Sequence, residues 1–459
     1  MSGWIGDAER SEGVYAGWWV LAATFVCAML VIGSTNYAFQ LFVVPVEQAF
    51  GLSRAAVNQG MSLFLVGGAF WAPIAGRVLD RFPAPAVMAT GGLLIAGGMA
   101  AIAATSSLAL MAAAIAGPMA LGAMFAGGLA NTTVVSRWFR RRRGRALGIA
   151  TVSSGAGGFV MVQVIAALIA RFGWRGALVW TGALIAATIG LLALFLIRSR
   201  PDEASLERAG ENDVDGSGSG PDARARLEGG SDASAREGPG PSASAAPERT
   251  WSLLETLGER NFWCIALGTG LLMASDGAVL VSKFPYLLEL GIEAQAASFL
   301  IGCMTASSVA GKIGIGLAAD RVDLRRLFGI VAVCHVLLLA ILIAKPGYGV
   351  LLVSLSLFGV GVGGVYPLLA TLTAAAFGSA SFGAVAGTMQ LVLLPISIGL
   401  VTFIGASHDR TGDYTLAFQV FLALVLVASV LIALVRLPQR PAPGPPRHPL
   451  LPLQPEVPR

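Results

Sequence analysis

Three charged side chains interrupt long apolar stretches of this sequence, where few other charged groups occur. Lys312 lies eight residues before Asp320, which places it about 12 Å inside the end of a helix. Asp276 and Lys283 lie in the preceding apolar stretch, seven residues apart and therefore on one helix face. Charged groups at membrane depth are costly and are usually functional. An ammonium in such a position can bind an anion, and a desolvated carboxylate can take up and release a proton.

Membrane-spanning helices must position these residues. The chain has 459 residues, of which 55% are hydrophobic and 12% charged, whereas roughly a quarter of a soluble chain is charged. A helix needs about 20 apolar residues to cross the bilayer, and twelve such segments can be placed. They lie near residues 17–40, 57–76, 85–105, 108–135, 147–170, 174–197, 262–285, 296–319, 327–344, 349–376, 383–404 and 416–436.

An internal repeat divides these segments into two sets of six. A Gly followed four residues later by Asp-Arg begins at Gly76 and again at Gly316, each time after a Gly/Ala-rich apolar stretch. Repeats of apolar segments are typical of transporters. The stretch between the two halves is polar and lacks large apolar side chains, which predicts disorder. The predicted domains are a cytoplasmic N-terminal segment at 1–16, a six-helix half at 17–197, a disordered cytoplasmic linker at 198–250, a second half at 251–436 and a disordered Pro-rich cytoplasmic tail at 437–459.

Arginines are concentrated in the connections on one side of the predicted bundle. The other side carries only Arg54, Arg171, Arg175, Lys345 and Arg410. The positive-inside rule therefore predicts that both termini and the linker are cytoplasmic. Topology and contact with anionic lipid headgroups account for the net charge of +5 without nucleic acid. The four cysteines lie in apolar runs without metal-ligand spacing, and no metal site is expected.

Further short motifs accompany the repeat. They are Glu12-Gly-Val-Tyr-Ala-Gly-Trp18-Trp19, the run from Trp138 to Gly148, Gly173-Trp-Arg175, Phe377-Gly378 with Phe382-Gly383, and Asp409-Arg-Thr-Gly412-Asp-Tyr414. With the two Gly-x-x-x-Asp-Arg loops and the central linker, the chain resembles the major facilitator superfamily. More narrowly, it resembles the monocarboxylate porter branch and the neighbouring oxalate/formate antiporters. The resemblance implies an all-α membrane protein with twelve helices in two pseudo-symmetric halves.

The resemblance also implies roles for individual residues. Porters of this kind use a cation in helix eight to bind the carboxylate and a helix-ten aromatic near the substrate, and these positions are Lys312 and Tyr366 here. Lys312 could instead pair with a protein carboxylate or carbonyl, or reach the cytoplasmic vestibule. Neutral polar residues on cavity-lining helices can shape the pocket or join helices by hydrogen bonds. Those predicted to bind substrate are Tyr37, Asn36, Asn131 and Gln390.

Two positions depart from the pattern of the animal porters. Ser308 stands where they carry an Asp one turn before the helix-eight cation, and Gln40 follows Tyr37-Ala-Phe39 in helix one where they carry a Lys. Proton coupling would then fall to Asp276, and anion exchange, which needs no proton carrier, stays open. Lys283, near the outer end of its helix, is expected to snorkel to the membrane interface and is a secondary candidate.

The repeated loops are predicted to act as a conformational latch. Glycines allow close helix contact in lipid, and carboxylates at helix ends can meet helix N-termini or neighbouring arginines. In the resembling transporters such contacts hold the cytoplasmic face closed while the site opens outward. The predicted latch residues are Gly76, Asp80, Arg81, Gly316, Asp320 and Arg321. Alternatively, the motif marks a polar turn.

These observations predict a secondary active transporter rather than an enzyme. The sequence has no nucleotide-binding Gly-rich loop, and no cofactor is expected. The expected protein is a multi-pass monomer of the plasma (inner) membrane, in contact with lipid, that moves a small organic anion by proton symport or anion exchange. One alternative is an exporter of larger amphipathic compounds, favoured if the cavity is wide and apolar with Lys312 turned away. Another is a membrane sensor on a transporter scaffold.

Overall fold

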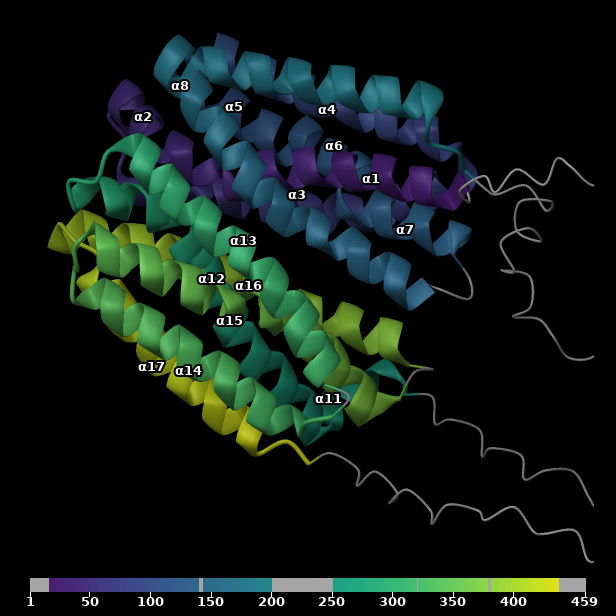
Figure 1. The fold of residues 1–459 in the computed structure, drawn as a ribbon, viewed down its shortest axis with the longest axis vertical. Coiled ribbons are helices and arrows are strands. Elements are labelled where there is room, and N and C mark those ends of the chain that lie inside the picture. The colour runs from purple at the N-terminus through teal and green to yellow at the C-terminus, as the bar shows by residue number, and fades with distance from the viewer. Residues whose placement is uncertain (1–15, 140–142, 200–250, 320, 379–380, 437–459) are drawn as a thin grey trace, which may run out of the picture.

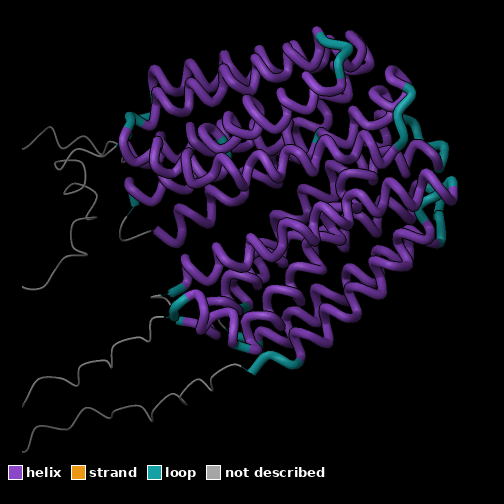
Figure 2. Tube along the Cα trace, turned by 180° about the vertical axis from the view of Figure 1, so that it is seen from behind, coloured by secondary structure: helices purple, strands orange, loops and turns teal. Residues whose placement is uncertain are grey.

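A computed structural model of the chain describes residues 16–139, 143–199, 251–319, 321–378 and 381–436. The predicted tail, nearly all of the predicted N-terminal segment and linker, and Asp320 lie outside the described residues. The described residues form helices and short connections, with no strand among them (Figure 2). The fold prediction of an all-α protein is therefore confirmed.

The N-terminal half begins with α1 and ends with a long bent helix, α8. Its elements are α1 (Ala16–Ile32), the π-helical turn η1 (Gly33–Tyr37), α2 (Phe39–Phe50), α3 (Arg54–Arg81), α4 (Ala84–Ala104), α5 (Leu108–Ala114), the π-helical turn η2 (Ile115–Met119), α6 (Ala120–Ala126), α7 (Gly128–Trp138) and α8 (Arg143–Phe195). Pro118 lies within η2, where its missing N–H cannot complete an α-helical ladder.

Helix α8 supplies two membrane spans. Within its 53 residues, Gly173 has φ 67° and ψ 172°, a conformation that glycine adopts with little strain. A straight helix of that length would extend about 80 Å, more than twice the hydrocarbon core of a bilayer. The described residues contain 11 helices long and apolar enough to cross a membrane. Because α8 supplies two of the spans, the described residues contain twelve, as predicted.

The C-terminal half contains six spans preceded by a short helix. Its elements are α11 (Leu253–Gly258), α12 (Arg260–Glu289), α13 (Ala294–Ala318), α14 (Leu324–Ile343), α15 (Tyr348–Phe377), α16 (Phe382–Thr411) and α17 (Thr415–Ala433). Ser252 and Glu255 form a capping box that begins α11, because each side chain accepts a hydrogen bond from the backbone N–H of the other.

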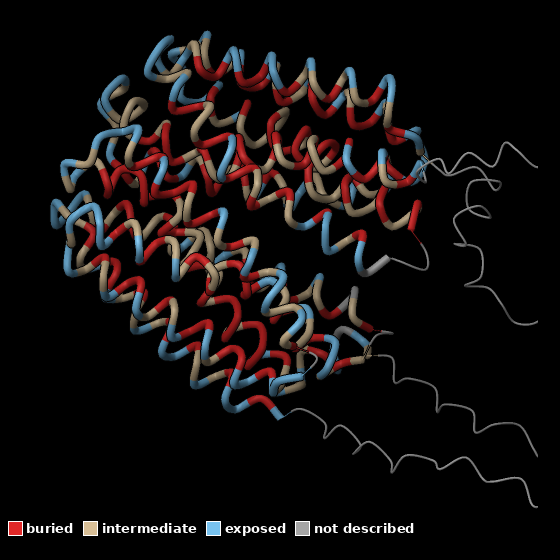
Figure 3. Tube along the Cα trace, in the orientation of Figure 1, coloured by how far each residue is buried: buried red, intermediate tan, exposed pale blue. Residues whose placement is uncertain are grey.

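The two halves lie side by side and contact each other through α3 with α16, α8 with α13, and α2 with α12. They approach closely at one end and diverge at the other (Figures 1 and 2). We call these the Arg54 end, where α3 begins, and the Asp80 end, where α3 finishes. Figure 3 shows buried positions on the inside of each half and exposed positions on the outside. Many of the exposed residues are large and apolar. An exposed apolar exterior of this kind is suited to contact with lipid.

Glycines bring α13 and α15 into direct backbone contact. A Cβ added at Gly311 would lie 1.9 Å from the carbonyl oxygen of Val360, and one at Gly363 would lie 1.8 Å from that of Ser308. Small residues permit such close approach, which supplies packing energy where lipid gives no hydrophobic drive between helices. This packing fixes α13, and therefore Lys312, against α15.

We expect Gly311→Ala to lower the free energy of unfolding by about 1–3 kcal/mol or more. The new Cβ would clash with the backbone of Val360, which a side-chain rotation cannot relieve. Thermal unfolding in detergent measures the effect. Gly314→Ala is the matched control on the same helix, since a Cβ there meets no heavy atom within 4 Å. Equal melting temperatures for the two variants would contradict the packing argument.

Candidate functional site

A cavity of about 1940 Å³ lies between the two halves. Its lining comes from α1, η1, α3, α6, α7 and α8 of one half and from α12, α13, α15 and α16 of the other. The lining extends to Arg145, Leu317 and Gly387, at the Asp80 end of their helices, where the halves diverge. The cavity therefore extends from the middle of the bundle to the Asp80 end.

All six residues predicted to bind substrate lie in the lining of this cavity, together with Asp276. They come from helices of both halves, so no single half contains the site. They are Asn36, Tyr37, Asn131, Lys312, Tyr366 and Gln390. Lys283 does not line the cavity.

Lys312 joins the two halves across the cavity. From α13, its ammonium donates hydrogen bonds to the hydroxyl of Ser154 and to the carbonyl oxygen of Thr151, 3.4 Å away, both on α8. Neither acceptor carries a charge, and no carboxylate among the described residues forms an ion pair with Lys312. Sequence reasoning missed Ser154 and Thr151, because small hydroxyl residues in a Gly-rich stretch give no local signal. An ammonium held by neutral groups at the edge of a cavity can accept an anion.

Asp276 lies near two phenol hydroxyls. It interacts electrostatically with Tyr37 and with Tyr366, and the Tyr37 hydroxyl hydrogen-bonds to Ser154, the partner of Lys312. The polar groups of η1, α8, α12, α13 and α15 therefore lie close together. No ion pair between Asp276 and Lys312 is present in the described part of the chain, so neither side chain is occupied by the other.

The charge of the lining favours anions. The charged residues among the described lining residues are Arg145, Asp276 and Lys312, which give two cations and one carboxylate. Most of the remaining lining is apolar, as in pockets where a few polar groups determine specificity.

Asn131 makes an interhelical hydrogen bond. Its amide nitrogen donates to the carbonyl oxygen of Ala150 at 3.2 Å, which links α7 to α8, and the residue is 2% exposed. Asn36 donates to the hydroxyl of the adjacent Thr35 at 3.0 Å. Among the described residues, the side-chain oxygen of Asn131 is buried and has no hydrogen-bond partner.

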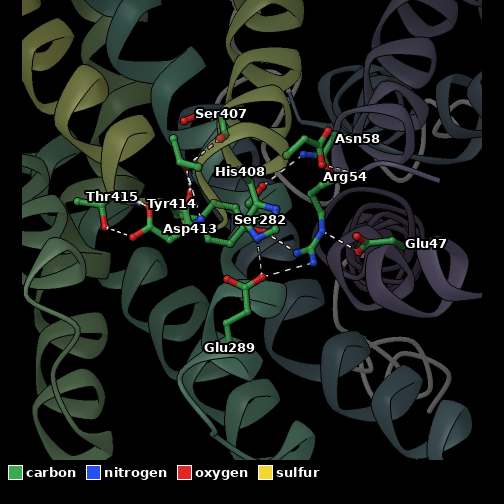
Figure 4. Close-up of polar contacts among 12 residues, drawn as sticks. Glu47, Arg54, Asn58, Ser282, Glu289, Ser407, His408, Asp413, Tyr414 and Thr415 are labelled. Carbon is green, nitrogen blue, oxygen red and sulfur yellow. Dashed lines mark hydrogen bonds and ion pairs between the residues drawn. The ribbon is translucent and has the colours of Figure 1, made fainter. Parts of the chain in front are cut away.

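At the Arg54 end, where the halves approach closely, a polar cluster of Arg54, Glu47, Glu289, His408 and Tyr414 joins them, and we call it the gate (Figure 4). The Arg54 guanidinium lies 2.8 Å from the Glu47 carboxylate and 3.4 Å from that of Glu289, and donates to the Tyr414 hydroxyl at 2.5 Å. His408 lies 2.9 Å from the same Glu289 oxygen. Arg54 and Glu47 belong to one half, and the other three residues belong to the other half. The gate therefore holds the two halves together.

Asp409 strengthens the gate by capping a helix of the other half. Its carboxylate accepts hydrogen bonds from the backbone N–H groups of Arg54 at 2.8 Å and Ala55 at 3.0 Å. These N–H groups lie in the first turn of α3, where donors lack intrahelical partners and negative charge is favourable. Asp409 and Tyr414 belong to a motif identified in the sequence, but nothing local in that motif indicated Arg54 as the partner.

Below the gate, two further hydrogen bonds cross between the halves. The Asn58 amide donates to the Ser282 hydroxyl at 3.4 Å, and the backbone N–H of Phe284 donates to the Gln40 side-chain oxygen at 3.0 Å. Lys283 lies between these two contact points on α12 and is 1% exposed. The expectation that Lys283 snorkels to the interface was therefore wrong, because close packing of the halves at this end encloses its side chain.

A family model described as the Major Facilitator Superfamily matches residues 21–402 of the chain. The chain belongs to the major facilitator superfamily. Human monocarboxylate transporter 7 is 27% identical over 92% of this chain and 86% of its own length. Monocarboxylate transporter 12 of Rattus norvegicus is 26% identical over 95% of this chain and 88% of its own length.

A solved structure shares the fold of this superfamily member. It is a bacterial homologue of the human lysosomal transporter Spinster in an inward-facing, occupied conformation, with a TM-score of 0.65 and 12% identity, covering 92% of this chain and 97% of the other. Identity this low supports likeness of fold alone. The family match confirms the superfamily that the motifs predicted, and the chain is similar to monocarboxylate transporters, as the motifs also predicted.

The predicted latch residues of this superfamily member lie at the Asp80 end. The Asp80 carboxylate accepts a hydrogen bond from Arg137 at 2.8 Å, within the N-terminal half, and Arg81 and Arg321 are exposed. A Cβ at Gly76 or Gly316 would meet no heavy atom within 4 Å, so neither glycine is in close helix contact in this conformation. Asp320 lies outside the described residues, and the latch therefore stays a prediction.

A second ion pair lies near the gate in the connection before α17. Lys345 lies 2.9 Å from Asp413, and the hydrogen bonds from Lys345 and then Thr415 lower the pKa of Asp413 below its usual 3.8. A lowered native pKa contributes stability that is present above the unfolded value and lost as the pH falls through the native one. The contribution is small because both side chains are substantially exposed.

We expect Asp413→Asn to lower the melting temperature slightly at pH 7 and to have a smaller effect as the pH falls below about 4. Thermal unfolding at both pH values measures the difference. Glu293→Gln, which removes a carboxylate from the connection before α13, is the control for a general change in charge. A larger loss of melting temperature at low pH than at pH 7 would contradict the lowered pKa of Asp413.

Proposed function

We propose that this chain is a secondary active transporter of a small organic anion of the monocarboxylate kind. The observation that supports it best is the Lys312 ammonium, which lines the cavity between the halves and is held by uncharged groups of the opposite half. A carboxylate entering the cavity supplies the anionic partner that no described residue provides. The printed names of the relatives, monocarboxylate transporters 7 and 12, agree with this substrate class.

Transport follows from exposing this site alternately to the two sides of the membrane. In the described conformation the gate is closed at the Arg54 end and the cavity extends to the Asp80 end. Arginine-rich connections at the Asp80 end make it the cytoplasmic side, so this is the inward-open state of a plasma-membrane protein. Rocking of one half against the other would open the gate and close the Asp80 end, where Gly76 and Gly316 leave room for close approach.

Export of a larger amphipathic compound is the second candidate. The cavity volume of about 1940 Å³ and its mainly apolar lining favour it. The position of Lys312 in the lining, rather than turned away from it, favours the carboxylate.

The test is uptake of labelled lactate, pyruvate, formate and oxalate into proteoliposomes, with and without a pH gradient. We expect at least one monocarboxylate to be taken up, with acceleration by an inward proton gradient for symport or by a trans-loaded anion for exchange. Empty liposomes give the background. Failure to move any of the four anions, combined with movement of an amphipathic dye, would replace this proposal by the second candidate.

Asp276 is proposed to carry the proton in a symport cycle. We expect Asp276→Asn to lower net uptake driven by a proton gradient by at least about tenfold and to leave exchange between pre-loaded and external anion intact, because Asn matches Asp in shape but cannot take up a proton. Paired measurements of net uptake and exchange on one preparation separate the two activities. Loss of exchange together with net uptake would remove the proton role.

A further inference from the structure

Among the described residues, the buried Lys283 ammonium has no anionic partner within ion-pair distance. It is 1% exposed, and in the described part of the chain its hydrogen bond goes to the sulfur of Met304 at 3.0 Å. A thioether is a weak acceptor, and an ammonium has three donors to satisfy. Burial of a charge with so few hydrogen-bond partners is energetically costly. In the described conformation, no contact of Lys283 among the described residues offsets this cost.

The position of Lys283 places it along the route that a substrate would follow. It lies seven residues after Asp276 on the same face of α12, about 10 Å further toward the Arg54 end. Asp276 lines the cavity, whereas Lys283 lies beyond its closed end. The residues on either side of Lys283 make the two hydrogen bonds to Asn58 and Gln40 that cross between the halves.

Opening the gate must break these contacts. The Arg54 contacts to Glu289 and Tyr414, and the Asn58 and Gln40 contacts below them, all join the N-terminal half to the C-terminal half. Separation of the halves at this end removes the cover on the face of α12 that carries Lys283. The ammonium would then face water and any anion entering from the Arg54 end.

We propose that Lys283 is the cation of a second carboxylate site, which forms only when the gate opens and receives the anion before it reaches Lys312. This inference rests on the proposed function, since it takes the same substrate class. A carboxylate satisfies the ammonium donors by charge-assisted hydrogen bonds, which the thioether of Met304 cannot do. Asp276 interacts electrostatically with Lys283 but forms no ion pair with it among the described residues, and so leaves the ammonium available.

The first test is independent of transport. In a chain whose native cysteines Cys27, Cys264, Cys303 and Cys334 are replaced by Ala, Lys283→Cys is labelled from outside with a charged, membrane-impermeant thiol reagent. We expect labelling to be at least about tenfold faster when the gate is weakened by Arg54→Ala than when Arg54 is present. Equal, negligible labelling in both backgrounds would show that the position never opens outward and would overturn the proposal.

The second test measures whether the Lys283 ammonium affects KM for substrate on one side of the membrane more than on the other. We expect Lys283→Met to raise KM for external pyruvate about tenfold or more in oriented vesicles, and to change KM for pyruvate on the Asp80 side less than twofold. Equal shifts on both sides, or no shift, would overturn the proposal. Lys345→Met, which removes an exposed cation at the same end, is the matched control and should change neither value.

The two tests separate the possible failures. If the wild-type chain moves none of the four anions, the proposed function fails, while the labelling result still decides whether Lys283 becomes exposed. If pyruvate is transported but the external KM is unchanged by Lys283→Met, only the second site fails. Met fills the volume of Lys without charge, so Lys283→Met should keep or raise the melting temperature, and this measurement excludes misfolding.

Discussion

Lys312→Met is expected to lower carboxylate transport at least about 30-fold, because it removes the cation that would otherwise pair with the substrate inside the cavity. Truncating one partner of a buried, hydrogen-bonded charge pair costs about 2–5 kcal/mol, which corresponds to roughly 30- to 5000-fold in affinity. The lower part of this range applies, since Lys312 is only partly buried. Initial rates of uptake over a range of pyruvate concentrations measure the loss.

Lys312→Arg and Lys345→Met are the controls for this prediction. Arg keeps the charge but replaces the compact ammonium by a planar fork, so partial transport should remain. Lys345→Met removes a cation from the surface near the gate and should leave the rate unchanged. Full transport by Lys312→Met would show that the substrate carboxylate binds elsewhere.

Arg54→Ala is expected to shift the resting population from the conformation that is open at the Asp80 end toward one that is open at the Arg54 end. The variant loses the contacts to Glu289 and Tyr414 that cross between the halves, and it leaves the Glu47 and Glu289 carboxylates near each other without their shared cation. Breaking a buried pair costs about 3–5 kcal/mol, but Glu289 is partly exposed, so we expect about 1–3 kcal/mol. This corresponds to a change of roughly 5- to 150-fold in the ratio of the two states.

Distances between spin labels on either side of the gate measure this shift. Gln48 on α2 and Arg410 on α16 are exposed sites for the labels in opposite halves. We expect the distance distribution to gain a longer component in Arg54→Ala. Arg175→Ala is the matched control, because Arg175 bonds to the carbonyl oxygens of Ala103 and Thr105 within its own half. An unchanged distribution in Arg54→Ala would mean that other contacts hold the halves together.

Much of the fold could be predicted because the signals are local. Long apolar segments must become helices in lipid, where every backbone polar group needs an internal partner. The repeat at Gly76 and Gly316 predicted two sets of these helices, and the family match and the candidate spans support the helical transporter fold. Lys312, Asp276 and Tyr366, which the sequence placed on helices that face the centre, line one cavity, and their roles in binding and proton coupling stay predictions.

The sequence by itself determined the helices, their grouping into halves and the few polar groups at membrane depth, because hydrophobicity and helical periodicity act over short stretches. Only the tertiary structure decided which of these groups meet. Arg54 and Tyr414 are separated by 360 positions, and Lys312 and Ser154 by 158, so their contacts depend on how the two halves are placed against each other. The same placement buried Lys283, whose position near a helix end had suggested exposure. The residues that surround a charge determine whether it is buried and at what energetic cost, and no local sequence pattern identifies them.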